Sequence, residues 1–151
     1  KPNLLVLTGG DDLGDTPERD DTEIAMLDYA LQEDLAVLGV CRGLQVINTH
    51  LRGTLTEVNG HVGQSHFISV TPHWAALYGE KVEVNSFHTK GIKKDGLAND
   101  LVATAIDDEN HVEAFCHQSK PVAAVMWHPE RDGAPKADHL LFSRLIDNGA
   151  F

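Results

Sequence analysis

The clearest pattern in the chain is a pair of short, uninterrupted apolar runs near its start. Residues 3–8 read NLLVLT and lead into Gly9-Gly10, and residues 35–40 read LAVLGV. Apolar runs of this length, bounded by turn residues, are typical of strands that are covered on both faces of a sheet. We therefore predict two buried strands that each end in a tight turn.

Helical patterns follow both runs. In the first, Asp20 can cap a helix whose third position is Glu23, and apolar residues then recur along one face. The second predicted helix covers residues 43–52 and ends at Gly53. Strand, helix, strand and helix in so short a stretch require right-handed parallel crossovers. We therefore predict an α/β fold of the flavodoxin-like type, a mostly parallel sheet with helices on both faces.

The remainder of the chain is less regular. Between residues 54 and 84, short β-like stretches alternate with Gly, His and Pro, so we expect loops and edge strands that cap the C-terminal edge of the sheet. Residues 111–116 and 121–127 are two further predicted strands, and the HQSK segment between them favours a hairpin. Apolar residues spaced from position 137 onward predict a final helix.

A cysteine stands at the junction of the second predicted strand and helix. The segment Gly39-Val40-Cys41-Arg42-Gly43 is a G-x-S-x-G nucleophile elbow with Cys in place of Ser. The turn is so sharp that a Cβ two positions on either side of the nucleophile would collide with backbone. At a helix N-terminus, the dipole and free N–H groups favour a thiolate and an oxyanion alike. The alternative is a buried structural cysteine beside packing glycines.

A thiol nucleophile needs a base, and the base needs a group that orients it. His128-Pro129-Glu130 ends the apolar run at residues 122–127. Residues two apart in an extended segment point the same way, so His128 and Glu130 project toward one face. The end of a parallel strand is also where α/β sheets place their sites. Taken alone, the segment would be a solvated strand end, and His88 is the first alternative base.

Two further segments could line a site. The Gly9-Gly10 pair leaves backbone N–H groups free to face an anion, with a plain tight turn as an equal alternative. A phosphate-binding loop is excluded there, because Asp15 stands where such a loop needs Lys. The NSFH segment at residues 85–88 either lines a pocket or forms an ordinary turn.

Other reactive side chains carry less information. Histidines stand at positions 61, 66 and 73, but no Cys or carboxylate joins them at a recognised metal-ligand spacing. We therefore expect solvated loop histidines and no metal site. Cys116 lies in an alternating strand without a glycine elbow, so we expect it to be packed.

Composition narrows the class of partner. The chain has 151 residues, with 12 Lys and Arg against 23 Asp and Glu, a formal charge of −11. That length suits one domain, residues 1–151. The acidic balance argues against nucleic acid or an anionic membrane as partner, and no apolar run is long enough to cross a bilayer. Two cysteines make no disulfide framework, so we expect a cytoplasmic protein. The missing initial Met suggests that the domain is N-terminally incomplete.

Three of these features occur together in one known family. The glycine pair at residues 9–10, the G-x-C-x-G-x-Q elbow at residues 39–45 and the HPE segment at residues 128–130 resemble the class I (triad) glutamine amidotransferase superfamily. The elbow and the NSFH segment look most like its γ-glutamyl hydrolase branch. Family members carry a further strand and helix before the Gly-Gly strand, and this sequence starts after them.

Residues 113–117 and 126–131 are also similar to members associated with bacterial capsule phosphoramidate biosynthesis. That similarity implies a γ-glutamyl nucleotide, such as γ-glutamyl-CDP-ethanolamine, as substrate. An acidic protein would then need local cations for the nucleotide, and Arg42 and Lys90 are the nearest candidates by sequence.

The resemblance implies an acyl transfer in two steps. Cys41 attacks the γ-carbonyl of glutamine or another γ-glutamyl amide, while backbone N–H groups of Gly10 and Arg42 hold the oxyanion. His128 moves the proton, Glu130 orients His128, and water hydrolyses the γ-glutamyl thioester to glutamate. No metal or organic cofactor is needed. The residues that the family would use to hold the substrate are Gly9, Gln45, Ser86, Phe87 and His88.

Three functions are compatible with these features. One is a free-standing hydrolase of a small-molecule γ-glutamyl amide, which the Cys-Arg-Gly elbow favours by analogy. Another is a glutaminase subunit or domain that donates ammonia to a synthetase partner. The third is a non-catalytic flavodoxin-like binding domain.

Overall fold

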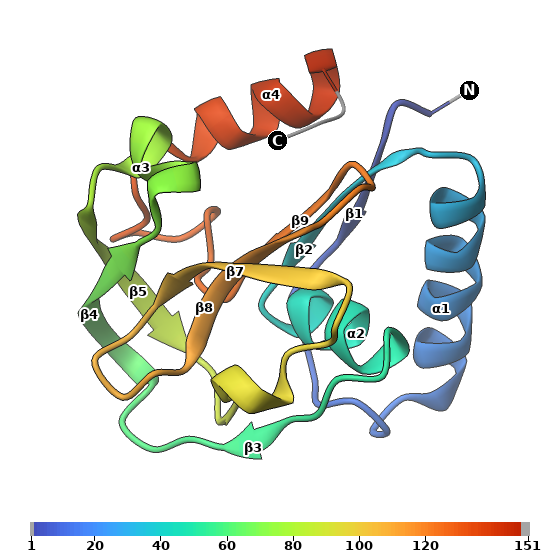
Figure 1. Cartoon of the computed structure of the whole chain (residues 1–151). Helices are drawn as coiled ribbons and strands as arrows, with labels where there is room; N and C mark the ends of the chain where they lie inside the picture. The colour runs from blue at the N-terminus through green and yellow to red at the C-terminus, as the bar shows by residue number, and fades with distance from the viewer. Residues whose placement is uncertain (1, 149–151) are drawn as a thin grey trace.

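The computed structural model describes residues 2–148 of the chain (Figure 1). Its strands are β1 (Leu4–Leu7), β2 (Ala36–Val40), β3 (Thr56–Glu57), β4 (Val62–Val70), β5 (Lys81–Phe87), β6 (Lys90–Gly91), β7 (Leu101–Ile106), β8 (Val112–His117) and β9 (Val122–Val125). Its helices are α1 (Pro17–Gln32), α2 (Arg42–His50), α3 (Pro72–Tyr78), the 3-10 helix η1 (Lys94–Gly96) and α4 (Asp138–Asn148).

Seven of these strands form one sheet, in the order β1-β2-β9-β8-β7-β4-β5, while β3 and β6 pair separately within the described residues. β1, β2 and β9 run parallel, and every other neighbouring pair is antiparallel. The α/β class is therefore confirmed, with a sheet that is mixed rather than mostly parallel. The physical reason is the short connections from β7 to β8 and from β8 to β9, which suit hairpins and cannot hold a crossover helix.

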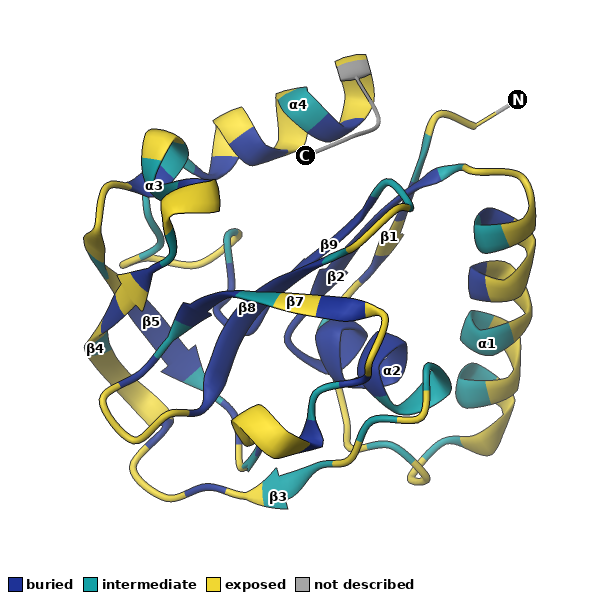
Figure 2. Cartoon of the chain, in the orientation of Figure 1, coloured by how far each residue is buried: buried dark blue, intermediate teal, exposed yellow. Residues whose placement is uncertain are grey.

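The helices cover both faces of the sheet, as predicted. α1 and α2 pack against each other and against β1 and β2, whereas α4 packs on β2, and α3 on β4 and β7. Figure 1 shows α3 and α4 together on one side and α1 and α2 on the other. Figure 2 shows β2, β8 and β9 as deeply buried strands of the sheet. Uninterrupted apolar runs encode β2 and β9, whereas β8 also buries the carboxylate of Glu113.

The register of the parallel strands sets the position of the candidate site. Leu7 pairs with Gly39, and Val40 pairs with Val125, so β1, β2 and β9 end at the same edge of the sheet. The residues that directly follow these strands therefore meet at that edge. They are the Gly9-Gly10 loop after β1, Cys41 after β2 and the segment up to His128 after β9.

Several local predictions need correction. α1 begins at Pro17 with Thr16 as its N-cap, and Asp20 lies inside the helix. Proline presets the first helical φ, so the helix begins one turn earlier than the capping pattern indicates. The expectation of edge strands between residues 54 and 84 is confirmed by β5, which lies at the edge of the main sheet. β4, by contrast, is a long strand between β5 and β7 and not part of a capping loop region. No helix within residues 2–148 is both long enough and apolar enough to span a bilayer.

Candidate active site

The nucleophile elbow adopts the strained geometry that its sequence predicts. Cys41 joins β2 to α2 with φ 50° and ψ −103°, a backbone conformation that residues other than glycine rarely adopt. Its backbone N–H donates to the Val125 carbonyl at 2.8 Å, which fixes the turn against β9. A Cβ on Gly43 would lie 2.0 Å from the Leu7 carbonyl oxygen, and one on Gly39 would lie 2.9 Å from the Gly43 backbone. Both glycines are therefore required by close contacts.

The thiol of Cys41 is largely shielded from solvent. The side chain is buried, and burial raises its pKa to about 11, although a hydrogen bond from the Arg42 backbone N–H acts in the opposite direction. Glu113 and Glu130 raise the same pKa further, and Arg131 lowers it. The thiolate is therefore scarce at neutral pH unless a neighbouring base accepts the proton.

His128 and Glu130 form a directed pair. Nδ1 of His128 lies 2.6 Å from Oε1 of Glu130, which leaves Nε2 as the ring nitrogen free to face a reacting group. Burial raises the pKa of Glu130, but hydrogen bonds from His128 and from its own backbone outweigh this and lower the pKa overall. Asn85 holds the backbone of His128 from both sides, accepting from its N–H at 2.8 Å and donating to its carbonyl at 2.9 Å.

Gly9 marks the place where the base and the nucleophile approach each other. A Cβ built on Gly9 would lie 2.7 Å from Cε1 of His128 and 3.7 Å from Cβ of Cys41. A pocket of about 460 Å³ lies on the His128 side of this contact, lined by Gly9, Gly10, His128 and Glu130 among others, whereas the buried Cys41 side chain does not line it. The structure thus brings the three residues predicted as a triad to one site, and their catalytic roles stay a prediction.

The loop predicted to supply an oxyanion donor is held by an arginine that the sequence analysis missed. Arg19 on α1 donates to the carbonyl oxygens of Gly9 at 3.0 Å and Thr8 at 3.3 Å. Its Nε pairs with Glu23 at 3.0 Å, and its Nη1 with Asp11 at 3.1 Å. The i, i+4 spacing of Arg19 and Glu23 was the available signal, but it says nothing about a loop that lies elsewhere in sequence.

Arg42 contributes its backbone to the site and its side chain to the scaffold. The guanidinium is almost fully buried and forms ion pairs with Asp20 and Glu23 of α1. Lys90, the other cation proposed for a nucleotide, pairs with Glu57. The expectation that Arg42 faces a leaving group is therefore wrong, because its guanidinium is buried against these carboxylates. Lys90 is partly exposed in its pair with Glu57, and its role toward a leaving group stays a prediction.

The residues predicted to hold substrate have different surroundings. Phe87 contacts the His128 ring edge-on, with centroids 5.7 Å apart, and lies at the site. Gln45 donates to the Lys90 carbonyl at 3.1 Å, Ser86 donates to the His61 carbonyl at 2.8 Å, and the His88 ring bonds the Lys90 carbonyl at 3.0 Å. These last three side chains are buried and engaged within the fold, and their predicted roles remain untested.

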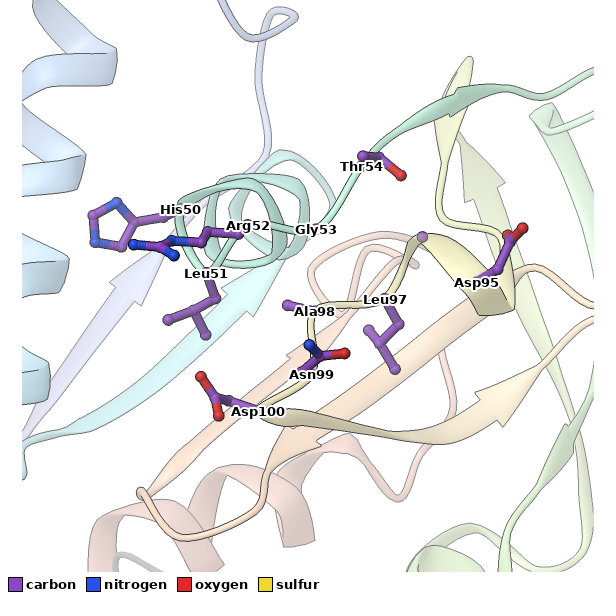
Figure 3. Close-up of a pocket in the computed structure, with 11 residues that line it drawn as sticks. His50, Leu51, Arg52, Gly53, Thr54, Asp95, Leu97, Ala98, Asn99 and Asp100 are labelled. Carbon is purple, nitrogen blue, oxygen red and sulfur yellow. The ribbon is translucent and has the colours of Figure 1, made fainter.

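A larger pocket lies away from these residues. Its volume is about 560 Å³, and Figure 3 shows it between the end of α2, near His50 and Arg52, and the segment from Asp95 to Asp100. None of the residues predicted as catalytic or substrate-binding lines it. The larger volume of this pocket therefore does not identify it as the candidate active site.

The prediction for the loop histidines is partly wrong. His61 is buried and His66 is half-buried, and both lie beside Glu113, whereas His73 is exposed on α3 as expected. Glu113 is far from both histidines in sequence, so no ligand-spacing pattern could reveal it. Cys116 is buried, as predicted, and like Cys41 it is a free cysteine.

The family model for peptidase C26 matches residues 10–130, which include the elbow and the HPE segment. The chain belongs to the peptidase C26 family. The resemblance to the class I glutamine amidotransferase superfamily is thereby confirmed.

Two relatives of this C26 member illustrate the range of the family. A Mycobacterium tuberculosis protein with a glutamine amidotransferase name is 35% identical, over 96% of this chain and 55% of its own length. A γ-glutamyl-CDP-amidate hydrolase from Campylobacter jejuni is 31% identical, over 85% of this chain and 62% of its own length. The chain thus spans 55% and 62% of the lengths of these two relatives.

Among solved structures, a Thermoplasma acidophilum protein described in connection with GMP synthase superposes with a TM-score of 0.80. It is 22% identical, and the match covers 95% of this chain and 71% of that one. The similarity confirms the glutamine amidotransferase-like fold.

Proposed function

We propose that this C26 family member hydrolyses a γ-glutamyl amide through a thioester on Cys41. The observation that carries the proposal is the convergence, at one sheet edge, of a strained elbow cysteine and a buried histidine that is hydrogen-bonded to a carboxylate. A nucleophile, a base and an orienting group in this relation form the general arrangement for covalent acyl transfer.

The first half-reaction forms the thioester. Nε2 of His128 takes the Cys41 proton as the sulfur attacks the γ-carbonyl carbon, and the carbonyl oxygen becomes an oxyanion. Backbone N–H groups of Arg42 and Gly10 stabilise this oxyanion, and loss of one such donor costs about 3 kcal/mol in comparable sites. The C–N bond then breaks, and His128 returns the proton to the departing amine.

The second half-reaction releases glutamate. Water gives a proton to His128 and attacks the thioester carbon, after which the C–S bond breaks and the proton returns to the Cys41 sulfur. Glu130 keeps the imidazole in the tautomer that presents Nε2 in both halves. Arg19 acts at a distance from the reacting atoms, because its hydrogen bonds to the Gly9 and Thr8 carbonyls hold the oxyanion loop in place.

The substrate class we propose is a γ-glutamyl amide with a leaving group larger than ammonia. The similarity to a γ-glutamyl-CDP-amidate hydrolase supports it, and so does the pocket of about 460 Å³ beside His128. Arg131 lines this pocket with its guanidinium carbon 4.4 Å from the centre of the Phe87 ring. It is half-exposed, so its charge can meet an anionic leaving group.

The test compares kcat/KM for glutamine, γ-glutamyl-γ-aminobutyrate and γ-glutamyl-CDP-ethanolamine, without any added partner and with Cys41→Ser as the blank. We expect one of the two larger amides to be preferred over glutamine. Arg131→Ala should raise KM for the nucleotide amide more than KM for glutamine. Equal efficiency on all three substrates would contradict the proposed substrate class.

A second candidate is a glutaminase that donates ammonia to a synthetase. The observation that favours it is the apolar rim of the catalytic pocket, where Val6 and Phe142 are each more than a third exposed. A partner that covers this rim would keep bulk water from the site. If glutamate release from glutamine appears only after a synthetase is added, this second function is correct and the free-standing hydrolase is not.

A further inference from the structure

Two histidines and two carboxylates gather beside β4, outside the proposed triad. β4 pairs with β7 only at Ser69 and Val70, and the ladder opens beyond that point toward the start of β4. The histidine–carboxylate cluster lies in this region and consists of His61, His66, Asp107 and Glu113. One ligand atom from each residue lies within 4.8 Å of the others. The four come from three separate stretches of the chain.

The spacing within the cluster suits a bound cation. A tetrahedral zinc with ligands at about 2.0–2.1 Å places neighbouring ligand atoms roughly 3.4 Å apart. Nε2 of His61 lies 3.5 Å from Oδ2 of Asp107, and Nε2 of His66 lies 3.6 Å from Oε2 of Glu113. Each of these two pairs is therefore at the separation that a shared cation would impose, and binding requires only that the pairs draw together.

The cluster contains polar atoms that no described residue satisfies. Both carboxylate oxygens of Glu113, Nδ1 of His61 and Nε2 of His66 are buried and have no hydrogen-bond partner in the described part of the chain. The Glu113 side chain is 1% exposed. The nearest ring nitrogens, from His61, His66 and His88, lie 3.6–3.8 Å from the Glu113 oxygens, beyond hydrogen-bond distance. A cation bound among these atoms would compensate the buried carboxylate at closer range.

The surroundings of Asp107 resemble the outer hydrogen bonds of a metal site. Its Oδ1 accepts backbone N–H groups of Glu109 at 2.9 Å and His111 at 2.8 Å, and its Oδ2 lies 2.9 Å from Nδ1 of His111. Such bonds orient a ligating carboxylate before the cation arrives. They also fix the tight turn that brings Asp107 toward His61.

We propose that His66, Asp107, Glu113 and one ring nitrogen of His61 bind a single divalent transition-metal ion. Mixed imidazole and carboxylate ligands suit zinc and its neighbours, whereas magnesium and calcium prefer oxygen ligands alone. The ion would tie the open end of β4 to β8 and to the turn after β7. It would also fix the segment after β5, because the His61 carbonyl accepts both the Ser86 hydroxyl and the His88 N–H at 2.8 Å.

The experiment measures zinc in purified, untagged protein that has been incubated with excess ZnCl2 and then dialysed against metal-free buffer. We expect about one zinc per chain in the wild type and less than about a tenth of that in Glu113→Gln and His66→Ala. His73→Ala is the matched control, since His73 is an exposed histidine outside the cluster, and Cys41→Ser excludes binding by the thiol; both should keep the ion.

Cobalt provides a second readout that does not depend on activity. A cobalt-loaded wild type should show visible absorption typical of low coordination, and His66→Ala should lack it. If Glu113→Gln fails to fold, as judged by circular dichroism, His66→Ala decides, because His66 is partly exposed and tolerates truncation. Wild type that retains no zinc, or His66→Ala that retains as much as wild type, would overturn the proposal.

Discussion

The substitution Gly9→Ala tests how closely the Gly9 loop and the His128 ring approach each other, because it adds a single methyl group between them. A Cβ at position 9 would lie 2.7 Å from Cε1 of His128, whereas carbon atoms in contact stay about 3.5–4.0 Å apart. The imidazole must therefore move by roughly 1 Å. Asn85 holds the His128 backbone on both sides, so the ring has to tilt, and its 2.6 Å bond to Glu130 lengthens.

A misplacement of about 1 Å in a catalytic group can cost on the order of 100-fold in rate, or about 2.7 kcal/mol in the barrier. We expect Gly9→Ala to lower kcat for glutamate release by about that factor with KM little changed. Alkylation of Cys41 by iodoacetamide at neutral pH should slow as well, because His128 no longer accepts the proton. This second assay does not depend on the identity of the substrate.

Gly60→Ala is the matched control for Gly9→Ala. Gly60 has φ 75°, and a methyl group added there would have no atom within 4 Å, so alanine strains the backbone without touching any neighbour. It should lower the free energy of unfolding by about 1 kcal/mol and leave kcat unchanged. A Gly9→Ala variant with kcat within threefold of wild type would refute the argument that His128 and the Gly9 loop share this space.

Three other predictions test separate parts of the account. Cys41→Ala and His128→Ala should each nearly abolish glutamate release, and the double variant should be little worse than either single, since the residues act as a unit; additive losses would indicate separate steps. Arg19→Ala should lower kcat by about tenfold through a looser oxyanion loop, with Arg19→Lys recovering part of the loss, and full activity in Arg19→Ala would exclude this positioning role. Burial raises the pKa of Asp138 to about 6, so the folded state holds this proton more tightly than the unfolded state does. The stability that this group contributes should therefore be greatest below pH 4 and decline as pH rises through 6, and the decline should be absent in Asp138→Asn when unfolding is followed across that range.

The parts of the fold that could be predicted are those encoded in short segments. Residues 35–40 contain a buried strand because an unbroken apolar run can pack on both faces of a sheet. The elbow could be predicted as well, because other backbone atoms lie so close to Gly39 and Gly43 that neither position has room for a side chain. His128 and Glu130 are two residues apart, so their shared direction is a local property. Such features need no knowledge of the rest of the chain.

The features that could not be predicted depend on residues far apart in sequence. Arg19 holds the Gly9 loop, and Glu113 meets His61 and His66, only because the sheet brings their segments together. The hydrophobic pattern marks only short β-like stretches between residues 54 and 84, and it does not say that β4 pairs antiparallel with β7. Partner choice in a sheet is decided by connection length and packing, and a local pattern contains neither.

The central claim is that a γ-glutamyl thioester forms on Cys41. The most direct test is acid quenching within the first turnovers on a γ-glutamyl amide, followed by mass spectrometry of the peptide that contains Cys41. We predict one γ-glutamyl group on that peptide in wild type and none in Cys41→Ser. Undiminished glutamate release by Cys41→Ser, or an adduct on another residue, would contradict it.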